Sequence, residues 1–217
     1  MKLIDHTRVS LIDYITAQCA ALVPDGKERL FRGAIAQHMN EALERTHRCI
    51  NACAPWKPDQ FNYLQSSQYC IFLYYLANTL WRRTGDPAAP TRLFLMNKAL
   101  NGIDLFYEIE MPEAFYIGHS VGIVLAKATY GNYLVLYQGV NVGRHVADIP
   151  VIGDRVILYP YSSVVGASKI DDGAVLSQGV KVIGKHVPAD TIAYAGEKGD
   201  LIWKPAPADL LGEYFRL

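Results

Sequence analysis

The sequence predicts an α+β protein in which a helical first half, residues 1–102, precedes a parallel β-helix over 103–205 and a tail over 206–217. Three observations support this prediction. Apolar residues in the first half recur near helical spacing. Proline and glycine clusters divide that half into segments of helical length. After about residue 103, apolar residues recur every six positions, a period that fits neither a helix nor a plain strand alternation.

The first half contains four segments with helical character. Pro24-Asp25-Gly26 ends a first helix after Val23, and a second helix is predicted over 27–54. Its apolar positions near helical spacing are Leu30, Ile35, Met39, Leu43 and Ile50. A third helix is predicted over 60–83, closed by Gly85-Asp86-Pro87, and a fourth over 91–100. We expect this half to pack against the second half and to mediate oligomerisation.

The six-residue period of the second half predicts the β-helix. Six aliphatic residues follow one another at this spacing: Ile152, Leu158, Val164, Ile170, Leu176 and Val182. A small or β-branched residue stands four positions after each of the first five: Val156, Ser162, Ser168, Ala174 and Val180. Ile117 and Ile123, with Val121 as the small partner, show a similar spacing. In a parallel β-helix with three faces per coil, one aliphatic per face fills the narrow prism and small residues fit the corners.

Composition narrows the classes of partner. The chain has 21 basic and 21 acidic residues and no basic stripe, which argues against nucleic acid. Met1–His6 carries charge where a signal peptide has an apolar run, and the apolar segment Cys70–Ala77 is too short to cross a bilayer. We therefore expect a cytoplasmic protein without membrane contact. The 51% content of hydrophobic residues favours buried subunit contacts.

The four cysteines raise the question of a metal site. Cys49 and Cys53 lie one helical turn apart, and His47 lies close by, but no second ligand pair at zinc spacing follows. We predict that all four cysteines, Cys19, Cys49, Cys53 and Cys70, are buried free thiols and that the protein holds no metal.

Two polar interruptions of the repeat are the candidate functional segments. One is Gly118-His119-Ser120, where a histidine follows a core aliphatic, and the other is the loop 143–150. Segments that leave a rigid solenoid are common places for binding groups.

These segments carry a family resemblance. His119-Ser120-Val121-Gly122-Ile123-Val124, followed by Gln138-Gly139-Val140-Asn141-Val142-Gly143, resembles the signature of serine O-acetyltransferases of the hexapeptide-repeat acyltransferase family. That signature reads His-Ala-Thr-Gly-Ile-Val, then Gln-x-Val-Thr-Leu-Gly, and its spacing agrees if one residue near Gly131 is deleted. The stretch Asp104–Glu110 looks closer still to relatives that accompany bacterial polysaccharide clusters. The resemblance implies a left-handed β-helix and acetyl transfer.

The resemblance implies that His119 is the catalytic base and that Asp104, fifteen positions earlier, orients it. Histidine titrates near neutrality and can accept a proton from an attacking hydroxyl, while a carboxylate on its other nitrogen fixes the tautomer. Glu108 and Glu110 remain competitors for that orienting role. Backbone N–H groups near Gly122 or Gly143 are candidates for stabilising the oxyanion.

The resemblance also implies acetyl-CoA as co-substrate, held in the groove between two neighbouring β-helices of a homotrimer or a dimer of trimers. The matching cofactor-binding positions are Gly143, Arg144, Pro160, Ser177, Gln178 and Gly179. Relatives usually have small residues where Pro160 and Gln178 stand, so the channel differs in shape. Lysine candidates for the CoA phosphates are Lys181, Lys185, Lys198 and Lys204.

The acceptor side departs from the family pattern. Gly118 stands where serine-specific members have aspartate, and Asp148-Ile149 stand where they have Arg-His; Arg144 or His145 are the candidate substitutes for binding a carboxylate. The resemblance still implies serine as the acceptor, and these departures make a sugar of surface-polysaccharide synthesis the alternative. Relatives that dock into the cysteine-forming sulfhydrylase end in isoleucine, whereas this chain ends Arg216-Leu217, so we expect docking to be weak or absent.

A rival class with the same predicted architecture is the trimeric zinc carbonic anhydrases, which need three converging histidines. The second half has His119, His145 and His186, and their separations are not close to whole coils. A third reading is an assembly module with a vestigial site, and the spacing of Asp104 and His119 argues against it.

Overall fold

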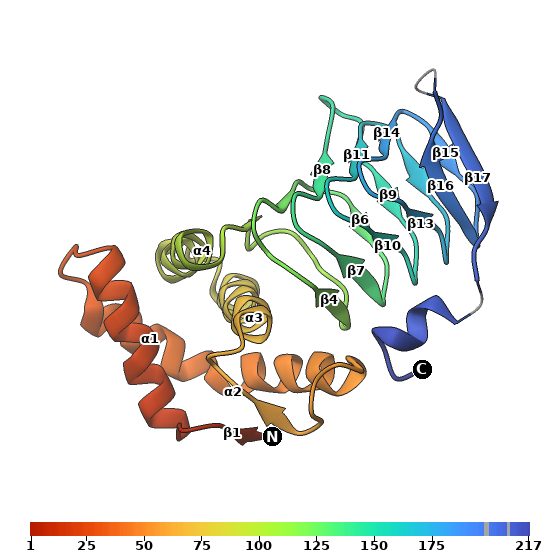
Figure 1. The fold of residues 1–217 in the computed structure, drawn as a ribbon. Helices are drawn as coiled ribbons and strands as arrows, with labels where there is room; N and C mark the ends of the chain where they lie inside the picture. The colour runs from red at the N-terminus through yellow and green to blue at the C-terminus, as the bar shows by residue number, and fades with distance from the viewer. Residues whose placement is uncertain (198–199, 208) are drawn as a thin grey trace.

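A computed structural model describes residues 1–197, 200–207 and 209–217, and it consists of four helices followed by a three-sided coil of short strands (Figure 1). The helices are α1 (Arg8–Leu22), α2 (Glu28–Ala52), α3 (Ser66–Thr84) and α4 (Ala88–Asn101). No helix in this described part of the chain is long and apolar enough to cross a membrane. The predicted α+β architecture is confirmed.

Local sequence explains where the helices begin and end. Thr7 and Ser10 form a capping box at the start of α1. Gly102 ends α4 with a φ of 64°, a left-handed conformation that glycine adopts without steric cost. The predicted start of the third helix at Gln60 is wrong, because Gln60–Phe61 form strand β2, which pairs with β1 (Lys2–Leu3). That pairing joins residues far apart in sequence, and no local pattern reveals it.

Helix α3 is the central helix of the first half. Every residue from Ser67 to Leu80 is buried, and α3 packs against α2 and α4. Helix α2 contributes Phe31, Ile35, Met39 and Ile50 to this core. Leu30, predicted on the apolar face of α2, is 75% exposed, and the neighbouring Phe31 is buried in its place.

The strands of the second half form three parallel sheets. Sheet I contains β3 (Asp104–Leu105), β5 (Val124–Leu125), β8 (Asn141–Gly143), β11 (Ser163–Val165) and β14 (Lys181–Ile183). Sheet II contains β4 (Phe115–Ile117), β7 (Leu134–Leu136), β10 (Ile157–Leu158), β13 (Val175–Leu176), β16 (Thr191–Ala195) and the antiparallel β17 (Leu201–Pro205). Sheet III contains β6 (Thr129–Tyr130), β9 (Val151–Ile152), β12 (Lys169–Ile170) and β15 (His186–Val187).

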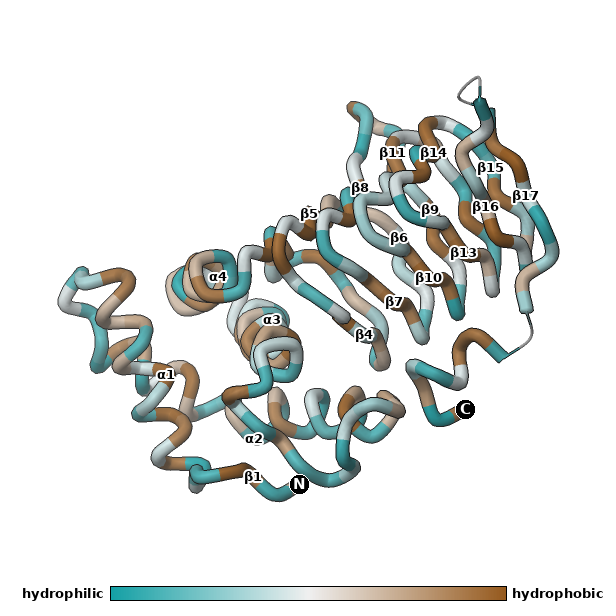
Figure 2. The backbone as a smooth tube through the Cα atoms, viewed as in Figure 1, coloured by the Kyte–Doolittle hydropathy of each residue, from teal (hydrophilic) through white to brown (hydrophobic). Residues whose placement is uncertain are grey.

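The predicted six-residue repeat is the core of this β-helix. Ile152, Leu158 and Val164 lie on sheets III, II and I in turn, and Leu158 pairs with Leu176 one 18-residue coil later. All six predicted aliphatics are buried, as are the five small residues at the corners: Val156, Ser162, Ser168, Ala174 and Val180. Figure 2 shows short hydrophobic stretches recurring from coil to coil.

The first complete coil departs from the repeat. Ile117 pairs with Leu136, and Leu125, rather than Ile123, pairs with Val142. Ile117 and Leu125 are therefore eight residues apart where Leu136 and Val142 are six apart. The predicted pairing of Ile123 with Ile117 in one aliphatic series is wrong, and Val121 is 70% exposed and does not fill the corner. The turn between β4 and β5 is thus two residues longer than a regular one.

The second irregular segment is the loop 143–150, which leaves the coil between β8 and β9 and projects from it (Figure 1). His145 and Asp148 exchange backbone hydrogen bonds of 3.0 and 2.9 Å, which makes the loop tip a tight hairpin. Val142 and Val164 are consequently 22 residues apart, four more than in a regular coil.

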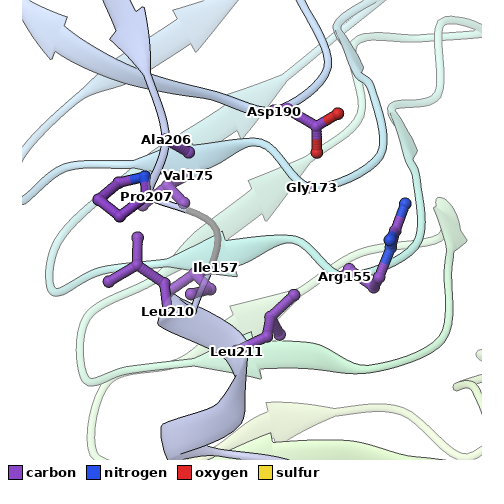
Figure 3. Close-up of a pocket in the computed structure, with 9 residues that line it drawn as sticks. All are labelled: Arg155, Ile157, Gly173, Val175, Asp190, Ala206, Pro207, Leu210 and Leu211. Carbon is purple, nitrogen blue, oxygen red and sulfur yellow. The ribbon is translucent and has the colours of Figure 1, made fainter. Parts of the chain in front are cut away.

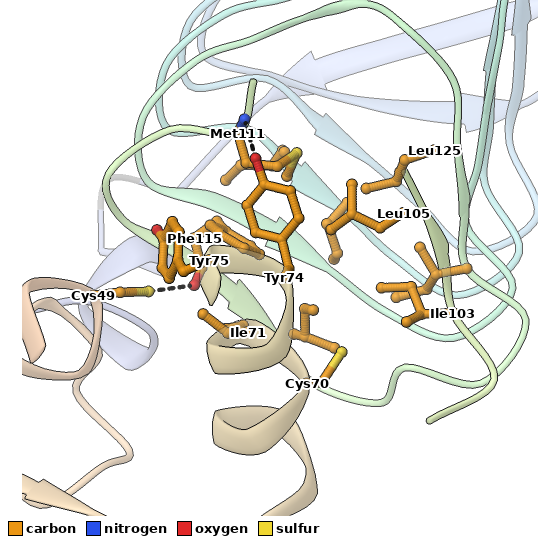
Figure 4. Packing of buried hydrophobic residues seen from close by; sticks show 14 of the residues in the cluster. Cys49, Cys70, Ile71, Tyr74, Tyr75, Ile103, Leu105, Met111, Phe115 and Leu125 are labelled. Carbon is orange, nitrogen blue, oxygen red and sulfur yellow. Dashed lines mark hydrogen bonds between the residues drawn. The ribbon is translucent and has the colours of Figure 1, made fainter. Parts of the chain in front are cut away.

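Helix α3 covers the start of the β-helix (Figure 4). Tyr74 and Tyr75 donate their hydroxyls to the carbonyls of Ile109 and Pro112 at 2.6 and 3.0 Å. Asn78 donates to the carbonyl of Tyr107 at 2.9 Å. These side chains satisfy backbone groups that have no preceding coil to pair with. The segment between β3 and β4 is fixed against the helical half.

Candidate functional site

His119 lies on the enlarged turn between β4 and β5. Its side chain is exposed, because the two additional residues carry the chain outward from the prism. Ser120 donates its hydroxyl to the Asn101 carbonyl at 2.6 Å, and the Gly122 N–H donates to the Gly102 carbonyl at 2.9 Å. Gly122 has a φ of 77°, which favours glycine. The turn is therefore held against the end of α4, and the Gly122 N–H is not available to an oxyanion.

The candidate orienting carboxylates have different partners. Asp104 accepts a hydrogen bond of 2.6 Å from Lys98 Nζ. Glu110 lies 3.8 Å from Arg82 and accepts from Asn78 at 3.4 Å, which directs it toward α3. Glu108 is exposed. Within the described residues, no hydrogen bond joins His119 to any of the three, so the identity of its orienting carboxylate stays a prediction.

The position of Asp104 in the fold is close to the His119 turn. Asp104 begins β3 and pairs in register with Val124 of β5, and its N–H donates to the Ile123 carbonyl at 2.8 Å. The Lys98–Asp104 pair is half exposed, so its contribution to stability is small. Separating Lys98 from the Asp104 carboxylate, so that water solvates both, therefore costs little free energy.

Successive turns stack below His119 and form one edge of the prism. We call this the His119 edge; it consists of residues 118–123, 137–140, 159–162 and 177–180, each connecting sheet II to sheet I. One backbone hydrogen bond links each turn to the next: Gly139 N–H to Val121 O (3.0 Å), Tyr161 N–H to Gln138 O (3.0 Å) and Gly179 N–H to Pro160 O (2.9 Å). The edge contains four of the predicted cofactor-binding residues: Pro160, Ser177, Gln178 and Gly179.

The remaining predicted binding residues lie elsewhere on the same chain. Gly143 ends β8, and Arg144 and His145 follow it, at the corner between sheets I and III. The width of sheet I separates them from His119. Arg144 and His145 are exposed on the projecting loop. One chain alone therefore does not bring the predicted acceptor-binding residues to the predicted base.

A cluster of tyrosines beside His119 was not predicted from the sequence. The ring centroids of His119 and Tyr137 lie 6.4 Å apart, and those of Tyr137 and Tyr159 5.6 Å. Tyr214 of the tail donates or accepts a 3.1 Å hydrogen bond with the Tyr137 hydroxyl, and Tyr116 packs on Tyr214. The sequence does contain a sign of this cluster: Tyr137 and Tyr159 each directly follow a core leucine, so they occupy equivalent positions in successive coils.

Tyr137 explains why glycine stands before His119. A Cβ atom added at Gly118 would lie 2.6 Å from Cε1 of Tyr137, closer than side-chain carbons approach. The ring of Tyr137 occupies the space beside the Gly118 backbone. An aspartate at position 118 would require this ring to move.

The other charged candidates are spread over the surface. Lys181 and Lys185 are exposed, Lys204 Nζ lies 5.7 Å from the Tyr194 ring centroid, and Lys198 falls outside the described residues.

The histidines and cysteines form no metal site in the described part of the chain. His186 lies on sheet III and is hydrogen-bonded to Asp171 at 2.6 Å, so the three histidines of the second half do not converge. The described residues contain no group of three or more His, Cys, Asp or Glu able to hold a metal. All four cysteines are free and buried.

A cavity of about 300 Å³ lies between the tail and strands β10 and β13 (Figure 3). Its lining includes Arg155, Ile157, Val175 and, from the tail, Leu210 and Leu211. No predicted catalytic, cofactor-binding or acceptor-binding residue lines it. This cavity therefore lies apart from the His119 edge.

Comparison with known proteins identifies similar chains. No family model matches. A serine acetyltransferase of Mycobacterium tuberculosis is 26% identical over 149 residues, covering 64% of this chain and 62% of that protein. A serine acetyltransferase of Synechococcus elongatus is 25% identical over 127 residues, covering 54% and 50%. The chain therefore spans between half and two thirds of the length of these curated relatives.

Solved structures show the same architecture. Serine acetyltransferase of Neisseria gonorrhoeae has a TM-score of 0.71 at 16% identity, covering 95% of this chain and 83% of that one. Isoform 3 from Entamoeba histolytica, solved in complex with cysteine, has a TM-score of 0.65 at 21% identity, covering 90% and 73%. These likenesses confirm the predicted fold, helices followed by a left-handed β-helix.

Proposed function

Because the chain is similar in sequence to serine acetyltransferases and shares their fold, we propose that it is an acetyl-CoA-dependent O-acetyltransferase. One observation supports this most: the exposed His119 stands on an enlarged turn, at the head of an edge that contains Pro160 and Ser177–Gly179. A base beside an open backbone-lined edge suits a reaction between a long thioester and a hydroxyl.

The proposed reaction is direct transfer, for which acetyl-CoA supplies the thioester. His119 accepts the proton of the acceptor hydroxyl as its oxygen attacks the acetyl carbonyl carbon. The resulting imidazolium then gives that proton to the departing thiolate sulfur, so the histidine ends the cycle neutral. Asp104 is the proposed partner of the imidazolium, released from Lys98 and turned toward the ring.

Assembly into trimers completes the proposed site. His119 and the loop residues Arg144 and His145 lie on different corners of one prism, so a neighbouring copy is needed to bring a loop to the edge. We expect light scattering to give a mass three or six times the 24.2 kDa of the chain. A stable monomer that retains full activity would contradict this.

Mixed assemblies provide a sharper test of the shared site. Arg144→Ala in one chain and His119→Ala in another damage opposite halves of a site built by two copies. Refolding the two variants together is expected to restore part of the activity that each lacks alone, because some interfaces then pair two intact halves. No recovery in mixtures shown to contain hetero-oligomers would place both residues in one chain's site.

The acceptor is proposed to be serine, with a sugar hydroxyl as the second candidate. Serine is favoured by sequence similarity. The sugar is favoured by Gly118, because this position carries no acidic side chain to pair with an amino group and the Tyr137 ring occupies the space beside it. In a site without an acidic partner, the ammonium group of serine loses its water and gains no opposite charge in return.

We expect thiol release from acetyl-CoA to proceed with serine at a high KM, and the assay compares serine, homoserine and a panel of nucleotide sugars. Efficient turnover of serine alone would show that Arg144 or His145 binds its carboxylate. Turnover of a nucleotide sugar with serine inert would establish the second candidate.

Docking of the C-terminus into a sulfhydrylase is proposed to be weak or absent. Phe215 is 1% exposed and pairs with Cys53, so the residues before Leu217 are engaged within the chain. In a pull-down with a cysteine-forming sulfhydrylase, we expect no retention above that of a chain lacking Leu217. Tight retention that disappears with this deletion would overturn the prediction.

A further inference from the structure

The C-terminal segment returns to the helical half and is anchored there by Arg216. Its guanidinium donates to the carbonyls of Asn51, Cys53 and Ala54 at 2.9, 2.6 and 3.0 Å, and also to that of Trp56. These carbonyls belong to the end of α2 and the residues after it, where helix carbonyls lack partners and a cation is favoured. Backbone bonds of 2.8 Å join Ala54 N–H to Tyr214 O and Arg216 N–H to Ala52 O.

The anchored segment places the side chain of Tyr214 against Tyr137 of the β-helix. Tyr214 is 7% exposed, its hydroxyl lies 3.1 Å from that of Tyr137, and the two rings meet edge to face at 6.2 Å. Burial raises the pKa of Tyr214 well above its usual range, and hydrogen bonds to Tyr137 and Tyr159 raise it further.

Tyr137 connects this contact to the reacting centre. Its ring lies beside His119 and against the backbone of Gly118. A continuous series of contacts thus runs from α2 through Arg216, Tyr214 and Tyr137 to the His119 turn. Tyr214 is 77 positions from Tyr137 in sequence, so this contact depends on the path of the tail back to the helical half.

We propose that the segment Tyr214–Arg216 fixes one wall of the acceptor site, in which Tyr137 determines acceptor specificity and the buried Tyr214, like Arg216, is a positioning residue. This inference rests on the proposed acetyl transfer. Through the half-buried Tyr137, the wall offers an aromatic face and a phenol hydroxyl without formal charge. It suits an uncharged hydroxyl compound with an apolar face, because aromatic side chains pair an apolar body with a polar tip.

The test is a comparison of kinetic constants for Tyr214→Phe, Tyr137→Phe and Arg216→Ala. Tyr130→Phe is the matched control, since Tyr130 is also a buried tyrosine and donates to Ala126 O at 2.6 Å, but on sheet III. With L-serine and methyl α-D-glucopyranoside as acceptor probes, Tyr214→Phe should raise the KM of the acceptor about 3- to 10-fold, because the Tyr137 hydroxyl loses the hydrogen bond that fixes it. The KM for acetyl-CoA should stay within about twofold, as should both constants in the control.

A second measurement separates this proposal from the proposed function. Leu217 is exposed and should be removed first in every variant. Carboxypeptidase should then remove Arg216 and the residues before it slowly from the wild type, whether or not either probe is acetylated. In Arg216→Ala this second stage should be rapid, and in Arg216→Lys intermediate. Rapid digestion of the wild type past Leu217 would overturn the anchored wall. A protected tail with an unchanged acceptor KM in both tyrosine variants would overturn the specificity role while leaving acetyl transfer intact. Absence of transfer to any hydroxyl would instead refute the proposed function.

Discussion

Replacement of His119 by alanine should lower the rate of acetyl transfer by about 10²- to 10⁴-fold, the range for loss of a general base. The side chain is exposed on a turn held by Ser120 and Gly122, so its removal should leave the fold unchanged. Acetyl-CoA affinity, measured by calorimetry, should stay within about twofold, because none of the proposed cofactor contacts lies on the turn that carries His119.

The chain provides a matched control in His186. This histidine is also exposed and pairs with an aspartate fifteen residues earlier, Asp171, at 2.6 Å. His186→Ala should leave turnover unchanged, because His186 lies on sheet III. Near-wild-type turnover in His119→Ala would remove His119 from the mechanism. Asp104→Asn, compared with Glu108→Gln and Glu110→Gln, should then identify the orienting carboxylate as the variant with the lowest kcat.

Replacement of Gly131 by alanine should destabilise the β-helix by about 3 kcal/mol or more, the range for strong overpacking. A Cβ atom at this position would lie 2.2 Å from the carbonyl carbon and oxygen of Gly153 in the next coil. The obstacle is backbone, so it cannot rotate away as a side chain would. The coils would have to separate, which breaks the bond from Gly131 N–H to Ile152 O.

Thermal unfolding at equal protein concentration measures this effect, with Gly33→Ala as the control. Gly33 lies within α2, and nothing stands within 4 Å of a Cβ added there. Alanine at that position should raise the free energy of unfolding by about 0.5–1 kcal/mol, since glycine weakens a helix interior. A Tm of Gly131→Ala equal to that of the wild type would show that the coils can move apart without cost.

The regular part of the fold was predictable because it is repetitive. Each of the aliphatics from Ile152 to Val182 marks one face, and the structure places each one in the prism. The enlarged turn was not predictable in the same way. Ile117 and Ile123 happen to be six apart, and a period cannot distinguish a residue in the aliphatic ladder from one that fills a corner.

The candidate site was predictable only in its local part. The motif around His119 and the late turns at Pro160 and Gln178 lie on one edge, as the coil length requires. Tyr214 reaches Tyr137 across 77 residues of chain, and Arg144 is separated from His119 by a whole sheet. Contacts between distant segments, within a chain or between copies, leave no periodic trace in the sequence.

The hydrogen bonds from α3 to the segment between β3 and β4 bear on how such chains can be recombined. The spacing of apolar residues changes near residue 102, which suggests a joint where one half could be exchanged for another. Yet the side chains of Tyr74, Tyr75 and Asn78 donate the hydrogen bonds that a preceding coil would otherwise supply. The accepting carbonyls are those of Ile109, Pro112 and Tyr107. A β-helix grafted behind foreign helices would begin with those carbonyls unpaired. The start of the solenoid therefore depends on its own helical half.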